Sequence, residues 1–327
     1  MTEGEKTNGA INRWSAKFAL STNWCNRRLE SGEEIVDMAL RLGFKALELG
    51  FHTTDFQVKG FKARLDEMPV GSVHAFCPVP ISAPQGYPEL YHLASFDEEA
   101  RKMAQFQIRK NIRFAAEMGA DALVLHLGRV MCRGCFSRWD FSRRVKRGLK
   151  MIDIAKKELA ALVPDLEANK VTLGLENLPY LEGFPAEWEM KELCGDWVKP
   201  WFDTGHDFVR KGFVPRCVLA RTAERSETAA GRAGTGELGG AAAEKQPSEA
   251  TQPKAARGTG PDGTVLGLHI NDSVGGDDHL APGQGKVDFA ALKPLAETAR
   301  HIVFEPHAGI TEPELAQGLA HLKSLWQ

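Results

Sequence analysis

The sequence predicts an α/β protein folded as a single (β/α)8 TIM barrel that a long insertion interrupts. Short β-rich runs alternate with stretches of helical periodicity along almost the whole chain, and eight such runs occur. The chain is also long enough for one complete barrel once the insertion is removed. The barrel domain is expected to span residues 13–327, after a flexible segment at residues 1–12.

The expected insertion covers residues 221–263, whose composition differs from that of the remaining chain. Of these 43 residues, 10 are Ala and 8 are Gly; Leu238 is the one large aliphatic residue, and none is aromatic. Such a segment cannot bury enough apolar surface to offset its ordering entropy, so it is expected to be disordered. Removing 43 residues from 327 leaves 284, which is close to the size of a typical barrel of about 250 residues.

The eight expected strands are short runs rich in β-branched and other apolar residues. They cover residues 17–21, 45–49, 72–76, 122–127, 171–176, 198–203, 265–270 and 301–305. The expected helices have apolar residues at every third or fourth position. They cover residues 33–42, 98–118, 143–162, 186–194, 289–298 and 313–325. A doubly wound open sheet is the alternative. It is disfavoured because the first strand is followed by the sequence STNW at 21–24 and not by a glycine-rich phosphate loop.

Composition narrows the classes of function. The chain has 41 Lys and Arg against 43 Asp and Glu, a formal net charge of −2, so nothing in its overall charge favours nucleic acid or membrane surfaces. No apolar run reaches the roughly 18–20 residues of a spanning helix, and residues 1–12 lack the apolar core of a secretion signal. Six cysteines at irregular spacing are too sparse for a disulfide framework. A cytoplasmic protein is expected.

Histidines and carboxylates lie where the apolar strands end. In a barrel these strand ends meet at one mouth, so the side chains are expected to share one cavity. Imidazole and carboxylate are ligands of zinc, manganese and related divalent ions, and this pattern therefore predicts a metal site. Nine candidates exceed the positions around one ion, so the site is expected to hold more than one ion, or one ion beside several substrate-binding groups. The candidate ligands are His74, His126, Glu176, Asp203, His206, His269, Asp277, His279 and Glu305.

Five motifs in order resemble the xylose-isomerase-like TIM-barrel superfamily, which contains sugar isomerases and epimerases and the endonuclease IV (AP endonuclease family 2) enzymes. The motifs are GLENL at 174–178, FDTGH at 202–206, HIND at 269–272, DDH at 277–279 and GQG at 283–285. The resemblance covers nearly the whole chain outside residues 1–12 and 221–263. The opening of the barrel and the run HLASFD at 92–97 look like sugar isomerase homologues.

The resemblance implies two ways of dividing the candidate ligands. In the epimerase branch, one ion is held by residues matching Glu176, Asp203, His269 and Glu305; the two glutamates exchange protons with the sugar, and the residue matching His206 contacts it. In the endonuclease IV branch, three zinc ions share all nine positions. His74, His126 and Glu176 match the ligands of one ion; the four residues of the epimerase site match those of the second; and His206, Asp277 and His279 match those of the third.

The leading hypothesis is therefore a metal-dependent sugar or sugar-phosphate isomerase or epimerase, with Glu176, Glu305 and His206 at the reacting centre and Zn2+ or Mn2+ as the ion. The alternative is an endonuclease IV-like zinc phosphodiesterase acting on abasic DNA. A barrel that binds a sugar or metal without turnover is a third hypothesis. The pattern leaves the substrate, the number of ions and the oligomeric state open.

Three further features are ambiguous. Residues 133–150 contain seven basic residues and one acid with interleaved aromatics, which suits a phosphate-binding surface or an ordinary solvated helix face. Cys132 and Cys135 form a CxxC pair without a second pair, which favours two incidental thiols over a zinc site. Glu48 ends the second expected strand and is a weaker candidate for the substrate site.

Overall fold

The computed structural model describes residues 18–130, 141–213, 264–276 and 279–327, and it does not describe the side chains of residues 141–143 and 211–213. The expected insertion at 221–263, the cysteine pair Cys132 and Cys135, and the candidate ligand Asp277 lie outside the described residues.

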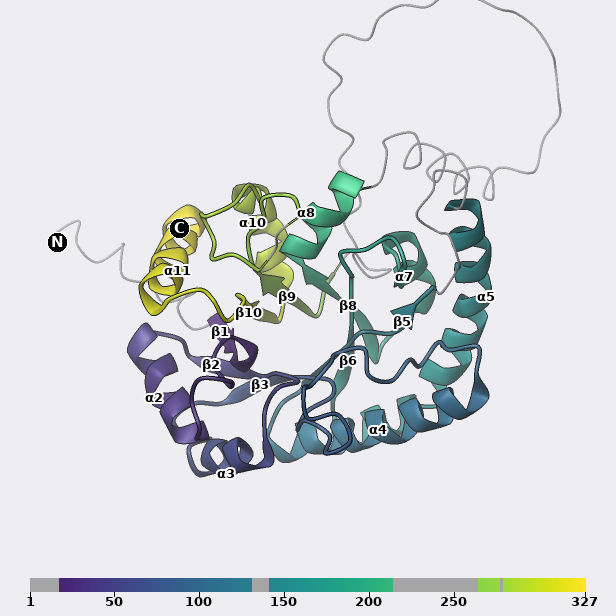
Figure 1. The fold of residues 1–327 in the computed structure, drawn as a ribbon, viewed down its shortest axis with the longest axis horizontal. Helices are drawn as coiled ribbons and strands as arrows, with labels where there is room; N and C mark the ends of the chain where they lie inside the picture. The colour runs from purple at the N-terminus through teal and green to yellow at the C-terminus, as the bar shows by residue number, and fades with distance from the viewer. Residues whose placement is uncertain (1–17, 131–140, 214–263, 277–278) are drawn as a thin grey trace, which may run out of the picture.

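Eight parallel strands close into a barrel, which confirms the predicted fold (Figure 1). In barrel order the strands are β1, β10, β9, β8, β6, β4, β3 and β2. Their bounds are β1 Phe18–Ser21, β2 Ala46–Leu49, β3 Val70–His74, β4 Ala122–Leu125, β6 Thr172–Glu176, β8 Val198–Asp203, β9 Gly267–Ile270 and β10 His301–Phe304. Strand β1 pairs with β10 on one side and β2 on the other, so the first and last strands close the barrel. All eight expected strands are present; β3 begins two residues earlier than expected, and several others are shorter.

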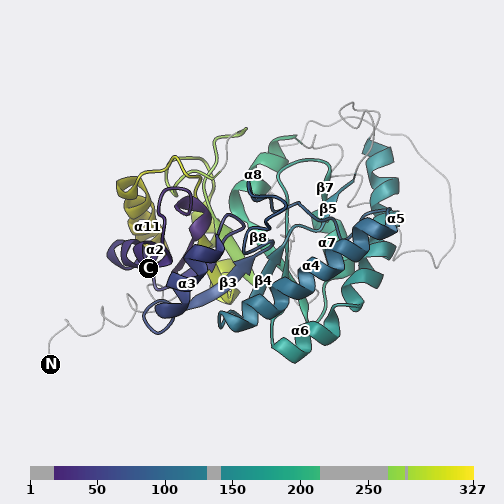
Figure 2. The same ribbon diagram turned by 60° about the horizontal axis from the view of Figure 1, so that its bottom comes forward.

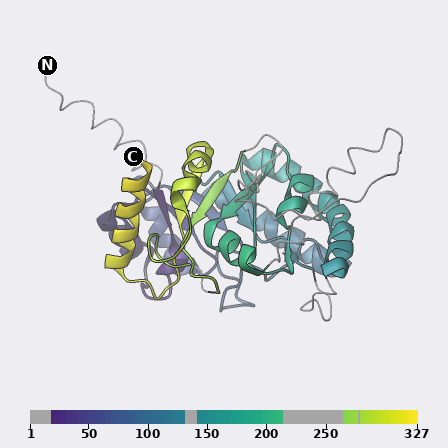
Figure 3. The same ribbon diagram turned by 90° about the horizontal axis from the view of Figure 1, so that it is seen from above.

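Helices surround the barrel (Figures 1 and 2). Their bounds are α2 Gly32–Leu42, α3 Asp55–Ala63, α4 Glu98–Glu117, α5 Phe141–Ala160, α6 Val163–Asn169, α7 Glu187–Leu193, α8 Thr204–Phe213, α10 Phe289–Thr298 and α11 Glu312–Trp326, with a 3-10 turn η1 at Thr22–Trp24. The C-terminal helix α11 lies at the edge of the molecule beside the N-terminal elements (Figure 3). Among the described residues, no helix is both long and apolar enough to cross a membrane.

Three helices were not expected from the periodicity. Helices α3 and α6 have nine and seven residues, which is too short for a clear repeat. A capping box starts α3: the Thr54 hydroxyl accepts the backbone N–H of Gln57, and the Gln57 side chain accepts the backbone N–H of Thr54. Helix α8 follows β8 with no intervening residue, so the FDTGH motif at 202–206 contains both the end of the strand and the first turn of the helix.

Two apolar clusters hold the barrel together. The larger cluster lies between the strands and the surrounding helices. The smaller one is formed by Ala19, Ala122, Val124, Trp201, Leu266 and Val303. Trp201, on β8, is fully buried, and two glycines on neighbouring strands make room for its ring. A Cβ atom on Gly174 would lie 2.9 Å from Trp201, and one on Gly267 would lie 2.4 Å from it.

A small antiparallel sheet, which the sequence did not predict, joins two of the loops that follow barrel strands. It consists of β5, Gly128–Arg129, and β7, Gly183–Phe184. A backbone hydrogen bond of 2.7 Å from Val130 to Glu182 extends the pairing. The segments after β4 and β6 are therefore held together on one side of the barrel mouth.

Candidate metal centre

The strand ends bring the candidate ligands to one place. His74, Glu176, Asp203 and His269 end or lie within β3, β6, β8 and β9; His126 and Glu305 follow β4 and β10 directly. His206 lies in the first turn of α8, and His279 lies in the loop after β9. All of these side chains are buried except that of His279, which is partly exposed. Of the nine predicted ligands, the structure gathers eight; Asp277 is the one outside the described residues.

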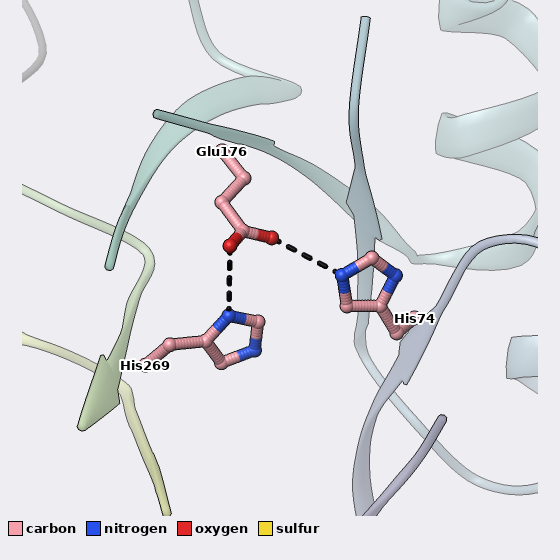
Figure 4. Close-up of side chains that lie close together, drawn as sticks. All are labelled: His74, Glu176 and His269. Atoms are coloured by element: carbon pink, nitrogen blue, oxygen red, sulfur yellow. Dashed lines mark hydrogen bonds and ion pairs between the residues drawn. The ribbon is translucent and has the colours of Figure 1, made fainter. Parts of the chain in front are cut away.

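Glu176 is at the centre of this group. Its Oε2 atom lies 3.1 Å from Nε2 of both His74 and His126. Its Oε1 atom lies 3.2 Å from Nδ1 of His269 and 3.3 Å from Nδ1 of His206. Figure 4 shows the two carboxylate oxygens of Glu176 turned toward different rings, one toward His74 and the other toward His269. One carboxylate thus connects four histidines.

The His269 ring is fixed between one carboxylate on one side and three on the other. Its Nε2 atom lies 3.1 Å from both carboxylate oxygens of Glu48, which also accepts a 2.8 Å hydrogen bond from the Ser72 hydroxyl. Because Glu48 only accepts, Nε2 carries the hydrogen, and in the neutral ring Nδ1 carries a lone pair. Nδ1 lies 3.1 Å from Glu305 Oε2, 3.2 Å from Glu176 Oε1 and 3.9 Å from Asp203 Oδ2.

The carboxylates of Glu176, Asp203 and Glu305 surround the lone pair of His269 Nδ1, and such a group of acceptors is stable only with a cation between them. Burial alone would lower the pKa of His269, but the charges of Glu305, Glu48 and Glu176 raise this pKa well above its ordinary value. Burial alone would raise the pKa of Glu176, but His269 and His126 hold it well below the usual range. Without a metal ion, the cluster therefore binds a proton at His269. A divalent ion would satisfy the same carboxylates.

The donor set also fits a metal ion. Glu176 Oε1 and His269 Nδ1 are buried and make no hydrogen bond, which is the condition a missing cation would relieve. Three groups have ligand atoms within 4.8 Å of one another. They are Glu176, Asp203, His269 and Glu305; His74, Glu176 and His269; and Asp203, His206 and His279. Nitrogen and carboxylate oxygen in groups of three or four are typical of zinc sites.

His206 and His279 form a second place where lone pairs converge. Their Nε2 atoms are 3.2 Å apart. Each Nδ1 atom is bonded to a backbone carbonyl, that of Asn177 at 2.9 Å for His206 and that of Glu305 at 2.7 Å for His279. Because a carbonyl can only accept, both Nδ1 atoms carry hydrogen, and two neutral rings would point lone pairs at each other. His279 also has a φ of 59°, a conformation that non-glycine residues adopt mainly under local constraint.

Two polar residues of the HIND motif, Asn271 and Asp272, hold this framework. The Asn271 side chain donates to Asp203 Oδ2 at 2.7 Å, and its Oδ1 atom accepts the backbone N–H of His279 at 3.1 Å. The Asp272 carboxylate accepts backbone N–H groups of Gly283, Gly285 and Val287 at 2.8–2.9 Å. The loop that carries His279 is therefore tied to the strand that carries His269.

Two residues near the ligands had no signal in the sequence. The Asn23 side chain, from η1, donates to Glu305 Oε1 at 3.0 Å. The Ser72 hydroxyl, from β3, orients Glu48. Each is a single common polar residue, and only the closed barrel brings it to its partner.

Six of the candidate ligands line a cavity of about 280 Å³. Beyond the ligands, its described lining consists of Phe51, Tyr87, Pro88, Glu89, Arg129, Pro179 and Tyr180. Sequence reasoning missed this wall, because the residues come from loops that have no periodicity. It is mainly apolar, with one polar group formed by Glu89, Arg129 and Tyr180.

Of the described basic residues in the segment 133–150, Arg144 is buried, whereas Lys146, Arg147 and Lys150 are exposed. The Arg144 side chain is buried, pairs with the carboxylate of Glu189, and donates to the carbonyls of Leu181 and Gly183. Arg144 is thus committed to holding α5 and α7 beside the loop that carries β7. Arg147 lies over the ring of Phe96, 4.9 Å from its centroid. Arg133 and Arg138 lie outside the described residues.

A family model described as xylose isomerase-like TIM barrel matches residues 36–325, and the chain belongs to this family. Similar solved structures include a D-tagatose 3-epimerase-like protein, with 20% identity, a TM-score of 0.61, and coverage of 94% of this chain and 96% of that one. The 3-keto-D-glucoside 4-epimerase YcjR from E. coli has 15% identity, a TM-score of 0.60, and coverage of 94% and 99%. The IolI protein, solved with a zinc atom, has 11% identity, a TM-score of 0.58, and coverage of 95% and 98%. At these identities the likeness shows the fold. No curated protein matches the chain.

Proposed function

We propose that this protein is a metal-dependent sugar isomerase or epimerase. The observation that carries the proposal is the placement of two glutamates, Glu176 and Glu305, beside one possible cation position. Their carboxylates lie 3.2 and 3.1 Å from the same atom, His269 Nδ1. The fold's similarity to structures of sugar epimerases supports this assignment.

The ion would be held by Glu176, Asp203, His269 and Glu305, the four-residue group of the site. When bound, it supplies a Lewis acid that polarises the carbonyl and hydroxyl of a sugar and so acidifies the neighbouring C–H bond. Asn271 keeps Asp203 in place, and Glu48 keeps the His269 ring in place, so the ligands are oriented before any ion binds.

The two glutamates then divide the proton transfer. One carboxylate removes the proton from a carbon that carries a hydroxyl group next to the carbonyl, and the other returns a proton to the opposite face. Inversion at that carbon is epimerisation, and the electron pair of the broken C–H bond forms the new C–H bond. Asn23 donates to Glu305 Oε1, so it holds this carboxylate in one orientation. His206, at the mouth of the same cavity, would contact a substrate hydroxyl.

A zinc phosphodiesterase acting on abasic DNA is the second candidate. It is favoured by the two additional ligand groups, one containing His74 and the other containing His206 and His279, which a single-ion epimerase does not require. The described wall of the cavity favours the sugar enzyme. Its lining includes Phe51, Tyr87 and two prolines, and Arg129, the one permanently cationic residue among the described lining residues, is already paired with Glu89.

The decisive experiment combines metal analysis with proton exchange. The purified protein, loaded with Mn2+ or Zn2+, is incubated in D2O with a panel of ketohexoses and separately with DNA containing an abasic site. We expect one tightly held ion per chain and deuterium incorporation at the carbon beside the carbonyl, both in the epimer and in recovered substrate. Glu305→Gln should abolish exchange. Three zinc ions per chain with DNA cleavage and no exchange would overturn the proposal in favour of the phosphodiesterase.

A further inference from the structure

Three side chains from separate loops meet on the cavity wall that faces the candidate metal centre. Glu89 comes from the loop between β3 and α4, Arg129 from β5, and Tyr180 from the loop between β6 and β7. The Tyr180 hydroxyl and the Arg129 guanidinium both donate to the Glu89 carboxylate. The Arg129 guanidinium also lies over the Tyr180 ring, 4.0 Å from its centroid. We call these three residues the rim cluster.

Contacts between separate loops hold the rim cluster together. The antiparallel pairing of Arg129 with Gly183 joins the segments that carry Arg129 and Tyr180. The Glu89 side chain is only 11% exposed, and its Oε1 atom lies 3.8 Å from Nδ1 of His126. The cluster thus contains one largely buried carboxylate, one guanidinium paired with it and one aromatic ring.

This combination is suited to a sugar hydroxyl. A hydroxyl both donates and accepts, so it can donate to the carboxylate and accept from the guanidinium at the same time. The aromatic side chains of Tyr87 and Phe51, which also line the cavity, offer apolar contact for the C–H groups of a sugar. Because Glu89 neutralises Arg129, the cluster has no net charge with which to bind a phosphate.

We propose that the rim cluster is a recognition subsite for the uncharged hydroxyl end of the sugar, remote from the reacting carbons, and that it selects free sugars over their phosphate esters. This proposal rests on the proposed function, because it places the reacting carbons between Glu176 and Glu305. The cluster and these glutamates line one cavity of about 280 Å³.

The test measures three forms of one substrate, each with the wild-type protein and with three variants. The best ketohexose from a panel that includes D-tagatose and D-psicose is assayed beside its 6-deoxy and 6-phosphate forms. Each variant keeps the approximate shape of its residue: Glu89→Gln, Arg129→Met and Tyr180→Phe. The control is Arg41→Met, which breaks the exposed ion pair of Arg41 with Glu312, between α2 and α11. Metal content and melting temperature are measured for every variant.

The wild-type protein should prefer the free sugar to its 6-deoxy form by about 10-fold to 100-fold in kcat/KM, the range set by hydrogen bonds to charged groups. Arg129→Met should raise KM for the free sugar more than it lowers kcat, and should bring the preference over the 6-deoxy form close to one. Glu89→Gln leaves Arg129 without its counter-charge and should shift preference toward the phosphate ester. Tyr180→Phe should show a smaller loss, and Arg41→Met should change nothing.

Three results would overturn the proposal, and they are distinguishable from one another. If the wild-type protein epimerises a sugar but the variants keep metal, turnover and unchanged preferences, then the rim cluster only joins loops and the proposed function stands. If the metal-loaded wild-type protein neither binds nor turns over any sugar of the panel, both the subsite and the proposed function fail. A wild-type preference for the 6-phosphate form would also refute the subsite.

Discussion

His269 Nε2 lies 3.1 Å from both carboxylate oxygens of Glu48, and both side chains are completely buried. The contact spans 221 positions of the chain and joins β9 to β2 across the barrel. This contact fixes the orientation of the His269 ring and also sets which ring nitrogen carries the hydrogen. By binding the Nε2–H group, Glu48 leaves the Nδ1 lone pair directed at Glu176, Glu305 and Asp203, and it makes the ring a stronger ligand.

Glu48→Gln should therefore weaken metal binding without removing a ligand. The amide keeps the shape of the side chain but loses the charge, and changes of this type in residues behind a ligand cost about 10-fold to 100-fold in metal affinity. Competition with a chelator measures the affinity directly. Glu99→Gln, on the exposed side of α4, is the matched control and should leave the affinity unchanged. Wild-type affinity in the Glu48 variant would show that the contact is only part of the core.

Glu176→Gln should be the most damaging single change at the centre. Glu176 belongs to two of the three ligand groups and contacts four histidines. Removing its charge takes away a candidate ligand. It also leaves the four buried histidines without the carboxylate that they contact, so metal content and turnover should fall together. Atomic emission analysis of dialysed protein, with activity on the same sample, checks both. Full activity in this variant would refute the site.

The double change His74→Ala with His126→Ala separates the two candidate functions. In the epimerase these residues lie outside the four-residue metal group, so one tightly held ion should remain and KM should rise more than kcat falls. In the phosphodiesterase they complete an ion's coordination, so one of several ions should be lost together with cleavage of abasic DNA. Counting ions per chain before and after the change decides between them.

The barrel interior gives a prediction about stability. A methyl group on Gly267 would lie 2.4 Å from the buried Trp201 ring, whose edge packs against His269 at a centroid distance of 5.2 Å. Gly267→Ala should destabilise the protein by about 1–3 kcal/mol, the usual cost of overpacking, and should weaken metal binding through the displaced ring. Denaturant unfolding measures the first effect. Gly195→Ala, where no atom lies within 4 Å of the added carbon, is the control. Equal stability of the two variants would contradict this packing argument.

The barrel was predictable because strands such as β4 are buried on both faces and read as continuous apolar runs. The gathering of the candidate ligands was predictable because closing such strands brings their ends together. Other parts of the site could not be read from the sequence. Glu48 lies one residue before the end of β2, but the sequence cannot tell whether this carboxylate faces a substrate or a histidine 221 positions away. The rim cluster depends on a sheet with two residues per strand, which is too short to show the alternating pattern of a strand in the sequence.

Metal binding should compete with protons, and the effect of pH on stability should reverse when the metal is removed. The pKa of His269 is raised in the metal-free protein, so this group stabilises the fold fully below its unfolded pKa, near 6.5, and the contribution is lost as pH rises through the raised folded value. Glu176 and Glu48 have lowered pKa values, so their contribution is present above about 4.5 and is lost as pH falls. Above pH 6.5, the metal-free protein should therefore lose stability.

The metal-bound protein should behave in the opposite way over the same interval. The ion displaces the proton at His269, so its affinity should rise by about tenfold per pH unit for each proton released, until the pH passes the raised pKa. The difference in melting temperature between metal-saturated and chelator-treated protein should consequently grow from pH 6 to pH 8. Calorimetry in buffers of different ionisation enthalpy should show at least one proton released per ion at pH 7. A stabilisation by metal that is constant or decreases over this interval would mean that His269 is not a ligand.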